Sequence, residues 1–104
     1  MKVKLSAEDR RWSLAVKERD VYTCRRCGST NPPGTRSLHA HHIFTRARKS
    51  TRHDVDNGIS VCFGCHMWSH RNPLEFHDWM KGELGPELYE DLQARSRILK
   101  RTGT

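Results

Sequence analysis

Residues 62–66 read Cys62-Phe63-Gly64-Cys65-His66, and the same Cys-x-x-Cys spacing occurs earlier in the chain at Cys24 and Cys27. This spacing lets both thiolates of a pair bind one ion from a tight turn, and two such pairs fill the four positions of a tetrahedral zinc site. Zinc held in this way has no open position and is structural. The doublet His41-His42 lies between the pairs, so any chemistry belongs to the histidines.

The chain is small and has little apolar material for a core. It has 104 residues, of which 35% are hydrophobic, so a metal would help to hold a single domain over residues 1–104. No apolar run approaches the ~20 residues that cross a membrane, and none follows the first residues as a signal would require. We therefore expect an intracellular protein without a membrane partner, whose reduced cysteines bind metal rather than form disulfides.

Positive charge is concentrated in the first half of the chain. The net charge is +7, and residues 1–54 carry 13 basic and 5 acidic side chains, against 6 and 7 in residues 55–104. A phosphate backbone is the polyanion that such a surface binds most readily. Charge alone does not distinguish a phosphate-binding segment from a solvated one. The candidates for backbone contacts lie in the densest cluster and are Arg46, Arg48, Lys49 and Arg52.

Local patterns predict helices on both sides of a strand–loop–strand–helix unit. Ser6 and Asp9 resemble a capping box, and Trp12 and Val16 follow at the spacing of a helix that ends near residues 20–22. Strands are predicted at 38–44 and 58–62. Helices are predicted after Cys65, over 74–81 with a proline in first position, and from about residue 86. The apolar stripe of the last helix consists of Leu84, Leu88, Leu92 and Leu99.

The central unit resembles the HNH endonuclease motif, in the variant whose two cysteine pairs hold a structural zinc. The resemblance covers about residues 24–70 and implies an α+β fold, the ββα-metal finger, in which two antiparallel strands and a helix hold a divalent metal. It also implies cleavage of phosphodiester bonds. The residues that carry it are Leu38-His39-Ala40-His41-His42-Ile43, Asn57-Gly58-Ile59-Ser60-Val61, and Cys62-Phe63-Gly64-Cys65-His66 followed by His70.

The resemblance implies a role for each motif residue. His41 and His66 take metal-ligand positions, and His42 takes that of the general base that accepts a proton from the attacking water. Adjacent strand residues point to opposite faces, which agrees with separate roles for His41 and His42. His70 lies one helical turn after His66, so it is a further ligand or a contact to the scissile phosphate. Asn57 has the middle position and is expected to hold loop and strand together.

The other histidines and two tryptophans are expected to have no part in the chemistry. His39 shares a strand face with His41 and could reach substrate, but surface or packing positions are the expectation for it and for His53 and His77. Trp68 and Trp79 are expected to be core aromatics rather than platforms for bases.

The ligand types limit the second metal. Two or three neutral imidazoles with water and phosphate oxygens suit Mn²⁺, Ni²⁺, Co²⁺ or Zn²⁺. Many family members have Asp at the position of His41, and the loss of this hard, negative ligand favours Mn²⁺ over Mg²⁺. The expected cofactors are structural Zn²⁺ and a catalytic Mn²⁺ or Mg²⁺, with Ni²⁺ or Co²⁺ as further candidates.

The resemblance implies an endonuclease that nicks DNA with little sequence specificity and leaves 5′-phosphate and 3′-hydroxyl ends. One site per chain cuts one strand, and a monomer or a weak dimer is expected. Small HNH proteins occur in phage packaging modules, restriction systems and mobile elements, so phage packaging proteins are candidate partners and the cytoplasm of a bacterial or phage-infected cell is the expected location. Two alternatives stay open: a non-catalytic zinc-ribbon-like nucleic-acid-binding module, and an RNA-directed nuclease on the same finger.

Overall fold

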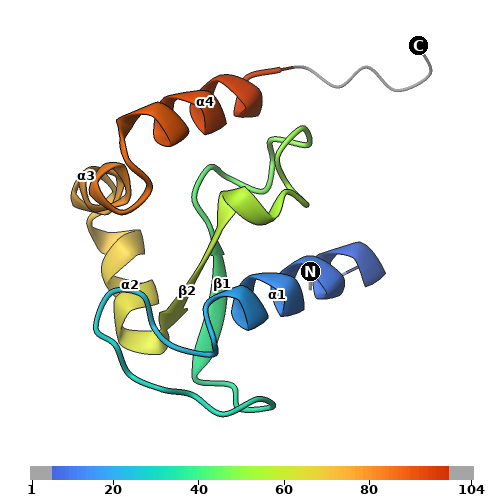
Figure 1. Cartoon of the computed structure of the whole chain (residues 1–104), viewed down its shortest axis with the longest axis vertical. Helices are drawn as coiled ribbons and strands as arrows, with labels where there is room; N and C mark the ends of the chain where they lie inside the picture. Colours follow the sequence, from blue (N-terminus) through green and yellow to red (C-terminus); the bar gives the residue numbers. More distant parts are fainter. Residues whose placement is uncertain (1–5, 99–104) are drawn as a thin grey trace.

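A computed structural model describes residues 6–98 of the chain. In Figure 1 the two strands lie at the centre, α1 lies beside them, and α2, α3 and α4 follow one another around the opposite side. The predicted α+β class, with helices flanking a strand–loop–strand–helix core, is confirmed. The elements are α1 (Ala7–Arg19), β1 (Leu38–His42), the 3-10 turn η1 (Val55–Asn57), β2 (Gly58–Cys62), α2 (Phe63–Arg71), α3 (Pro73–Leu84) and α4 (Pro86–Ser96).

The two faces of the antiparallel sheet are covered by different helices. His41 pairs with Ile59 across the strands, and His42 pairs with Gly58. Because side chains alternate along a strand, the face that carries His41 and Ile59 is the one that packs on the apolar side of α3, which contributes Phe76. The face that carries His42 and Gly58 lies against α1. The sheet thus separates α1 from the helices of the second half.

Helix α1 packs closely on the sheet because β2 begins with glycine. A Cβ atom at Gly58 would lie 2.4 Å from Cγ2 of Val16 and 2.7 Å from Cζ2 of Trp12, closer than real Cβ contacts. Both of these α1 side chains are buried. The predicted capping box forms, since the Ser6 hydroxyl accepts from the Asp9 N–H and the Asp9 carboxylate accepts from the Ser6 N–H. The position of α1 is therefore fixed at its first turn and along its inner face.

Two element ends differ from the predictions for the first half of the chain. Helix α1 ends at Arg19, just before the predicted range 20–22, because Val21 and Tyr22 adopt left-handed φ angles of 54° and 52°. Strand β1 ends at His42 rather than at residue 44. The N–H and C=O of Phe44 both bond to the side-chain amide of Asn57, at 2.8 and 2.9 Å, which takes the chain out of the sheet.

The first two helices after the sheet, α2 and α3, are longer than predicted. Helix α2 begins at Phe63, so Cys65 lies within its first turn rather than before it. Helix α3 has the predicted proline in its first position but continues past residue 81 to Leu84. Trp68 and Trp79 are half-buried and pack against the core, as predicted. Among residues 6–98, no helix combines the length and the apolar character needed to span a membrane.

The predicted apolar stripe is confirmed at Leu92, which is buried in α4, and at Leu84, which packs against the core, but not at Leu88. The buried residues of α4 are Tyr89, Leu92 and Ser96, whereas Leu88 is 39% exposed. The tyrosine ring packs beside Phe44, with ring centroids 5.4 Å apart, so it takes the core position that was predicted for a leucine. The predicted Leu99 lies outside the described residues.

The end of α4 is fastened to the segment between the strands. The Arg95 guanidinium contacts the carboxylates of Asp54 and Asp56 in this segment and that of Asp91 one turn earlier in its own helix. The Ser50 hydroxyl donates to the Arg95 carbonyl at 2.6 Å. These contacts hold the segment between the strands against α4.

Candidate active site

The four cysteines meet in one cluster. Their sulfur atoms all lie within 4.8 Å of one another, and all four are free of disulfides. Sulfur atoms that share a tetrahedral zinc ion at about 2.3 Å lie roughly 3.8 Å apart. The Sγ atoms of Cys27 and Cys62 are 3.7 Å apart, so the cluster fits zinc. Such an ion would tie the turn after α1 to the end of β2 and the start of α2.

Local hydrogen bonds shape the first cysteine turn for this purpose. The N–H of Gly28 donates to the Cys24 carbonyl at 2.9 Å, and this glycine has a left-handed φ of 80° that side chains rarely adopt. The N–H of Cys27 points at the Cys24 sulfur, 3.4 Å away. On the other side of the cluster, the Arg26 guanidinium lies 3.6 Å from the Cys65 sulfur and covers the Trp68 ring. Hydrogen bonds from Ser29 lower the pKa of the Cys27 thiol to about 6, whereas burial raises the pKa of the Cys65 thiol to about 12 although the Arg26 guanidinium acts to lower it.

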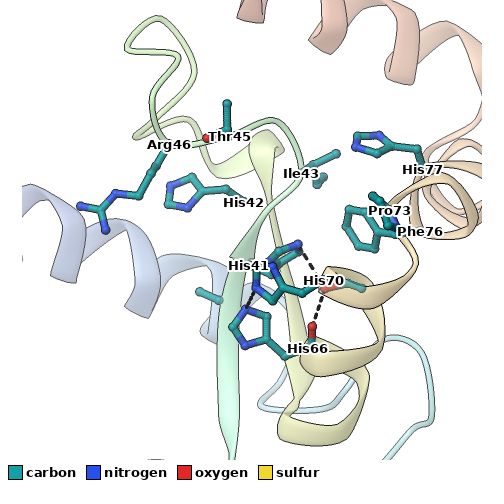
Figure 2. A pocket seen from close by; sticks show the side chains of 12 residues that line it. His41, His42, Ile43, Thr45, Arg46, His66, His70, Pro73, Phe76 and His77 are labelled. Carbon is teal, nitrogen blue, oxygen red and sulfur yellow. Dashed lines mark hydrogen bonds between the residues drawn. The ribbon is translucent and has the colours of Figure 1, made fainter. Parts of the chain in front are cut away.

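Three histidines form a second cluster next to the first. His41 comes from β1, and His66 and His70 lie one turn apart on α2 (Figure 2). One ring nitrogen from each lies within 4.8 Å of the others, and the Nε2 atoms of His66 and His70 are 3.1 Å apart. Ligands about 2.0–2.1 Å from one ion lie roughly 2.8–3.4 Å apart at octahedral or tetrahedral angles. The donor set therefore fits a divalent cation with positions left for water or phosphate.

Burial keeps two of these imidazoles neutral. It lowers the pKa of His41 to about 3, with a further contribution from the neighbouring His66 and His70. It lowers the pKa of His66 to about 4, helped by His39 and His70. Only the neutral imidazole has a lone pair for a metal, so both side chains are in the ligand form at neutral pH.

His42 points to the opposite face of the strand from the other three histidines (Figure 2). Its Nε2 lies 3.0 Å from the carbonyl oxygen of Arg52. A carbonyl only accepts, so Nε2 carries the proton and Nδ1 keeps a free lone pair. The Trp12 indole stacks on the ring at a centroid distance of 3.9 Å and an angle of 8°. Burial lowers the pKa of His42, so the ring is ready to accept a proton at neutral pH.

Asn57 is fully buried beneath the segment that follows β1. Besides binding both backbone groups of Phe44, its amide donates to the Thr51 carbonyl at 3.2 Å, and its own carbonyl accepts from the Ile43 N–H at 2.9 Å. Its side chain touches backbone at both ends of this segment. Asn57 thus has no exposed surface, and its side chain is used to hold the backbone of this segment.

The four predicted basic residues have different surroundings. Arg52 donates twice to Asp9, at 3.0 and 2.8 Å, and this guanidinium holds the pKa of the Asp9 carboxyl far below its usual range. Arg46 lies 3.7 Å from the same carboxylate and also reaches the pocket beside His42. Arg48 and Lys49 are exposed, and neither side chain has an ion-pair partner within residues 6–98. Arg52 therefore serves first as an internal tie between α1 and the segment that positions His42.

One pocket of about 550 Å³ brings the two histidine groups together. His41, His66 and His70 line it, and so do His42 and Arg46. His41 and His42 point to opposite faces, yet both reach this pocket because it lies at the end of β1, where the strand leaves the sheet.

His77 of α3, for which a surface or packing position was expected, also lines this pocket. Its Nδ1 lies 2.9 Å from the Tyr89 hydroxyl oxygen of α4. It lies outside the motif, and its position beside Phe76 was the only signal that could have pointed to it. By contrast, His39 stacks on His66 at a ring distance of 4.8 Å, and His53 pairs with Asp9.

Residues 24–72 match the family model described as HNH endonuclease. The match takes in both cysteine pairs and the histidines of β1 and α2, and it leaves α1, α3 and α4 outside. No curated protein and no solved structure matches the chain. The HNH assignment implies nuclease activity with a divalent metal on a nucleic-acid substrate, and the four-cysteine cluster is compatible with zinc. Residues 24–72 are therefore similar to the HNH endonuclease family and have the ββα-metal arrangement of two antiparallel strands followed by a helix.

Proposed function

We propose that the protein is a metal-dependent endonuclease that hydrolyses DNA phosphodiester bonds and nicks one strand with little sequence specificity. The observation that carries this proposal is the shared pocket. Three histidines that could bind a metal line it, and so does His42, whose tautomer is fixed by the Arg52 carbonyl. A non-catalytic binding module has no need for this combination.

The histidine cluster would hold the catalytic ion through His41, His66 and His70. A divalent ion there stabilises the negative charge that develops on the phosphate and on the departing oxygen. The three side chains come from β1 and α2. Helix α2 contains Cys65, and β1 is paired with β2, which ends at Cys62. The structural zinc would therefore act on the reaction only by fixing the positions of these ligands.

His42 would accept the proton of the attacking water at Nδ1. The water oxygen bonds to phosphorus and the bond to the 3′ oxygen breaks. The departing 3′ oxygen takes a proton from solvent, so the products carry a 5′-phosphate and a 3′-hydroxyl. The imidazolium that forms is stabilised by its Nε2–H, which donates to the Arg52 carbonyl. The carbonyl stays in place because the Arg52 side chain is held by Asp9.

DNA is the proposed substrate because Arg46 lines the pocket and the exposed Arg48 and Lys49 follow it in the same segment, where phosphate contacts do not depend on base sequence. The proposal is tested by incubating the purified protein with supercoiled plasmid and a divalent ion. We expect conversion to the open-circular form before any linear form, since one site cuts one strand. If the protein cleaves a structured RNA faster than the plasmid, its substrate is RNA rather than DNA. If it cleaves neither, the alternative of a non-catalytic nucleic-acid-binding module is favoured.

The proposed ligands make the choice of metal testable. Three imidazoles without a carboxylate suit Mn²⁺ better than Mg²⁺, which prefers oxygen ligands. After chelation and dialysis, we expect half-maximal nicking at a concentration of Mn²⁺ at least about tenfold lower than that of Mg²⁺. Half-maximal activity at equal or lower Mg²⁺ would contradict the proposed ligand set.

Trp12 is expected to position the base. Trp12→Leu removes the ring that stacks on His42, and we expect the single-turnover nicking rate to fall about tenfold or more, because a displaced base loses its reach to the water. Trp12→Phe keeps a ring and should retain most of the rate. Trp79→Leu removes a half-buried indole elsewhere and serves as the matched control. Equal losses of rate in Trp12→Leu and Trp79→Leu would show that lost stability, not lost positioning, is the cause.

A further inference from the structure

A second hollow adjoins the active-site pocket. It has a volume of about 340 Å³ and lies between the segment after β1 and the C-terminal part of α4. Ile43, Thr45 and His77 line both spaces, so the two lie next to each other. In Figure 2 the His77 ring points from α3 toward Ile43, at the boundary between them. A chain-like ligand bound at the histidine cluster can therefore continue past His77 into this groove.

The groove has the charge that a phosphate backbone requires. Arg48 lines it from the segment after β1, and Arg97 lines it from the end of α4. Both are exposed, and within residues 6–98 neither guanidinium has an ion-pair or hydrogen-bond partner. No Asp or Glu lines the groove. Arg46 and Arg52 differ, because Asp9 already neutralises part of their charge.

Arg95 and its carboxylate partners tie α4 to the segment between the strands. Asp54, Asp56 and Asp91 all contact the Arg95 guanidinium, and none of the three lines the groove. The same contacts, with the bond from Ser50 to the Arg95 carbonyl, join the two walls of the groove. The groove is therefore preformed, and binding does not have to order its walls.

His77 is suited to contact the strand at the boundary. The Tyr89 hydroxyl occupies its Nδ1 at 2.9 Å, which leaves Nε2 as the nitrogen for a ligand. The rings of Phe44 and Phe76 flank it at centroid distances of 5.3 Å each. These contacts fix the orientation of the His77 ring, so its Nε2 can form a hydrogen bond to a strand that passes between the two spaces.

We propose that a DNA strand bound at the active site leaves it across His77 and lies in this groove, where Arg48 and Arg97 contact phosphates beside the scissile one. The inference rests on the proposed nuclease function, because it assumes that the strand enters the histidine pocket. It assigns α4, which lies outside the family match, a direct part in substrate binding.

The test measures binding without cleavage. In a His42→Ala background, Arg48→Gln and Arg97→Gln are each titrated with a fluorescent DNA duplex at several salt concentrations. We expect each change to weaken DNA binding at least about threefold. Because each change removes one phosphate contact, a plot of the logarithm of the association constant against the logarithm of salt concentration should become less steep by about 0.9. In the cleaving protein, the same changes should raise KM and leave kcat unchanged.

Arg36→Gln is the matched control. It removes the same charge from an exposed position in the loop 32–37, which lies at the other end of the molecule from α4 (Figure 1). If Arg48→Gln and Arg97→Gln change the DNA affinity and the salt slope no more than Arg36→Gln does, the proposal that DNA binds in this groove is wrong. Because this readout is binding, it is independent of whether His42→Ala stops nicking, which tests the proposed function separately.

Discussion

Nicking of supercoiled plasmid should fall by about 10²–10⁴-fold in His42→Ala, because the reaction loses its proton acceptor while the metal ligands stay in place. The His42 ring contacts Trp12 and the Arg52 carbonyl, but it belongs to neither metal cluster. The variant should therefore keep its zinc content and its affinity for DNA. Single-turnover nicking, zinc analysis and DNA titration on one preparation measure all three.

His53→Ala is the control for this change. It removes an exposed imidazole that pairs with Asp9 and lies outside the pocket, so the nicking rate should stay within about twofold of the parent rate. A His42→Ala protein that nicks at the parent rate would contradict the proposed base. Loss of DNA binding in the same variant would mean that His42 contributes to substrate binding rather than acting as the general base.

The largest effect on stability is expected from Cys24→Ala. Cys24 is buried, and its loss opens a four-thiolate site that would join the turn after α1 to β2 and α2. Structural zinc sites contribute about 10–16 kcal/mol of binding free energy to folding. We expect the free energy of unfolding to fall by at least about 3 kcal/mol, which corresponds to roughly 12–24 °C in Tm for a chain of this size. Thermal unfolding with zinc analysis measures both.

Ser29→Ala is the control that distinguishes loss of a zinc ligand from loss of a neighbouring side chain. The Ser29 hydroxyl lies 3.3 Å from the Cys27 sulfur and is not one of the four ligands. Its removal should lower stability by only about 1 kcal/mol and leave zinc content unchanged. A Cys24→Ala protein with full zinc content and an unchanged Tm would show that the cysteines do not form the structural site.

The sequence could predict the parts of the fold that depend on local spacing. The Cys-x-x-Cys turns, the period-two alternation that separates His41 from His42, and the one-turn spacing of His66 and His70 are all local, and the structure contains the elements they predict. The end of β1 was wrong by two residues because Asn57, more than ten positions away, captures the backbone of Phe44. No local pattern encodes such a contact.

The surroundings of His42 were also beyond sequence reasoning. Arg52 looked like a free cation in a basic cluster, yet it pairs with Asp9, 43 positions earlier. The stacking of Trp12 on His42 joins α1 to β1 across the intervening cysteine turn. His77 reaches the pocket only because α3 folds back over the sheet. The segments outside the family match thus supply the walls of the site, and their contacts depend on tertiary packing.

The central claim is that the two clusters bind metal for different purposes. The most direct test is to dialyse the purified protein against a mild chelator and to measure zinc per chain and plasmid nicking on the same sample, before and after adding Mn²⁺. We expect a single retained zinc ion, an unchanged Tm and no nicking until Mn²⁺ is added. Nicking by the zinc-retaining protein while the chelator is present, without any added ion, would contradict the separation of a structural site from a catalytic one.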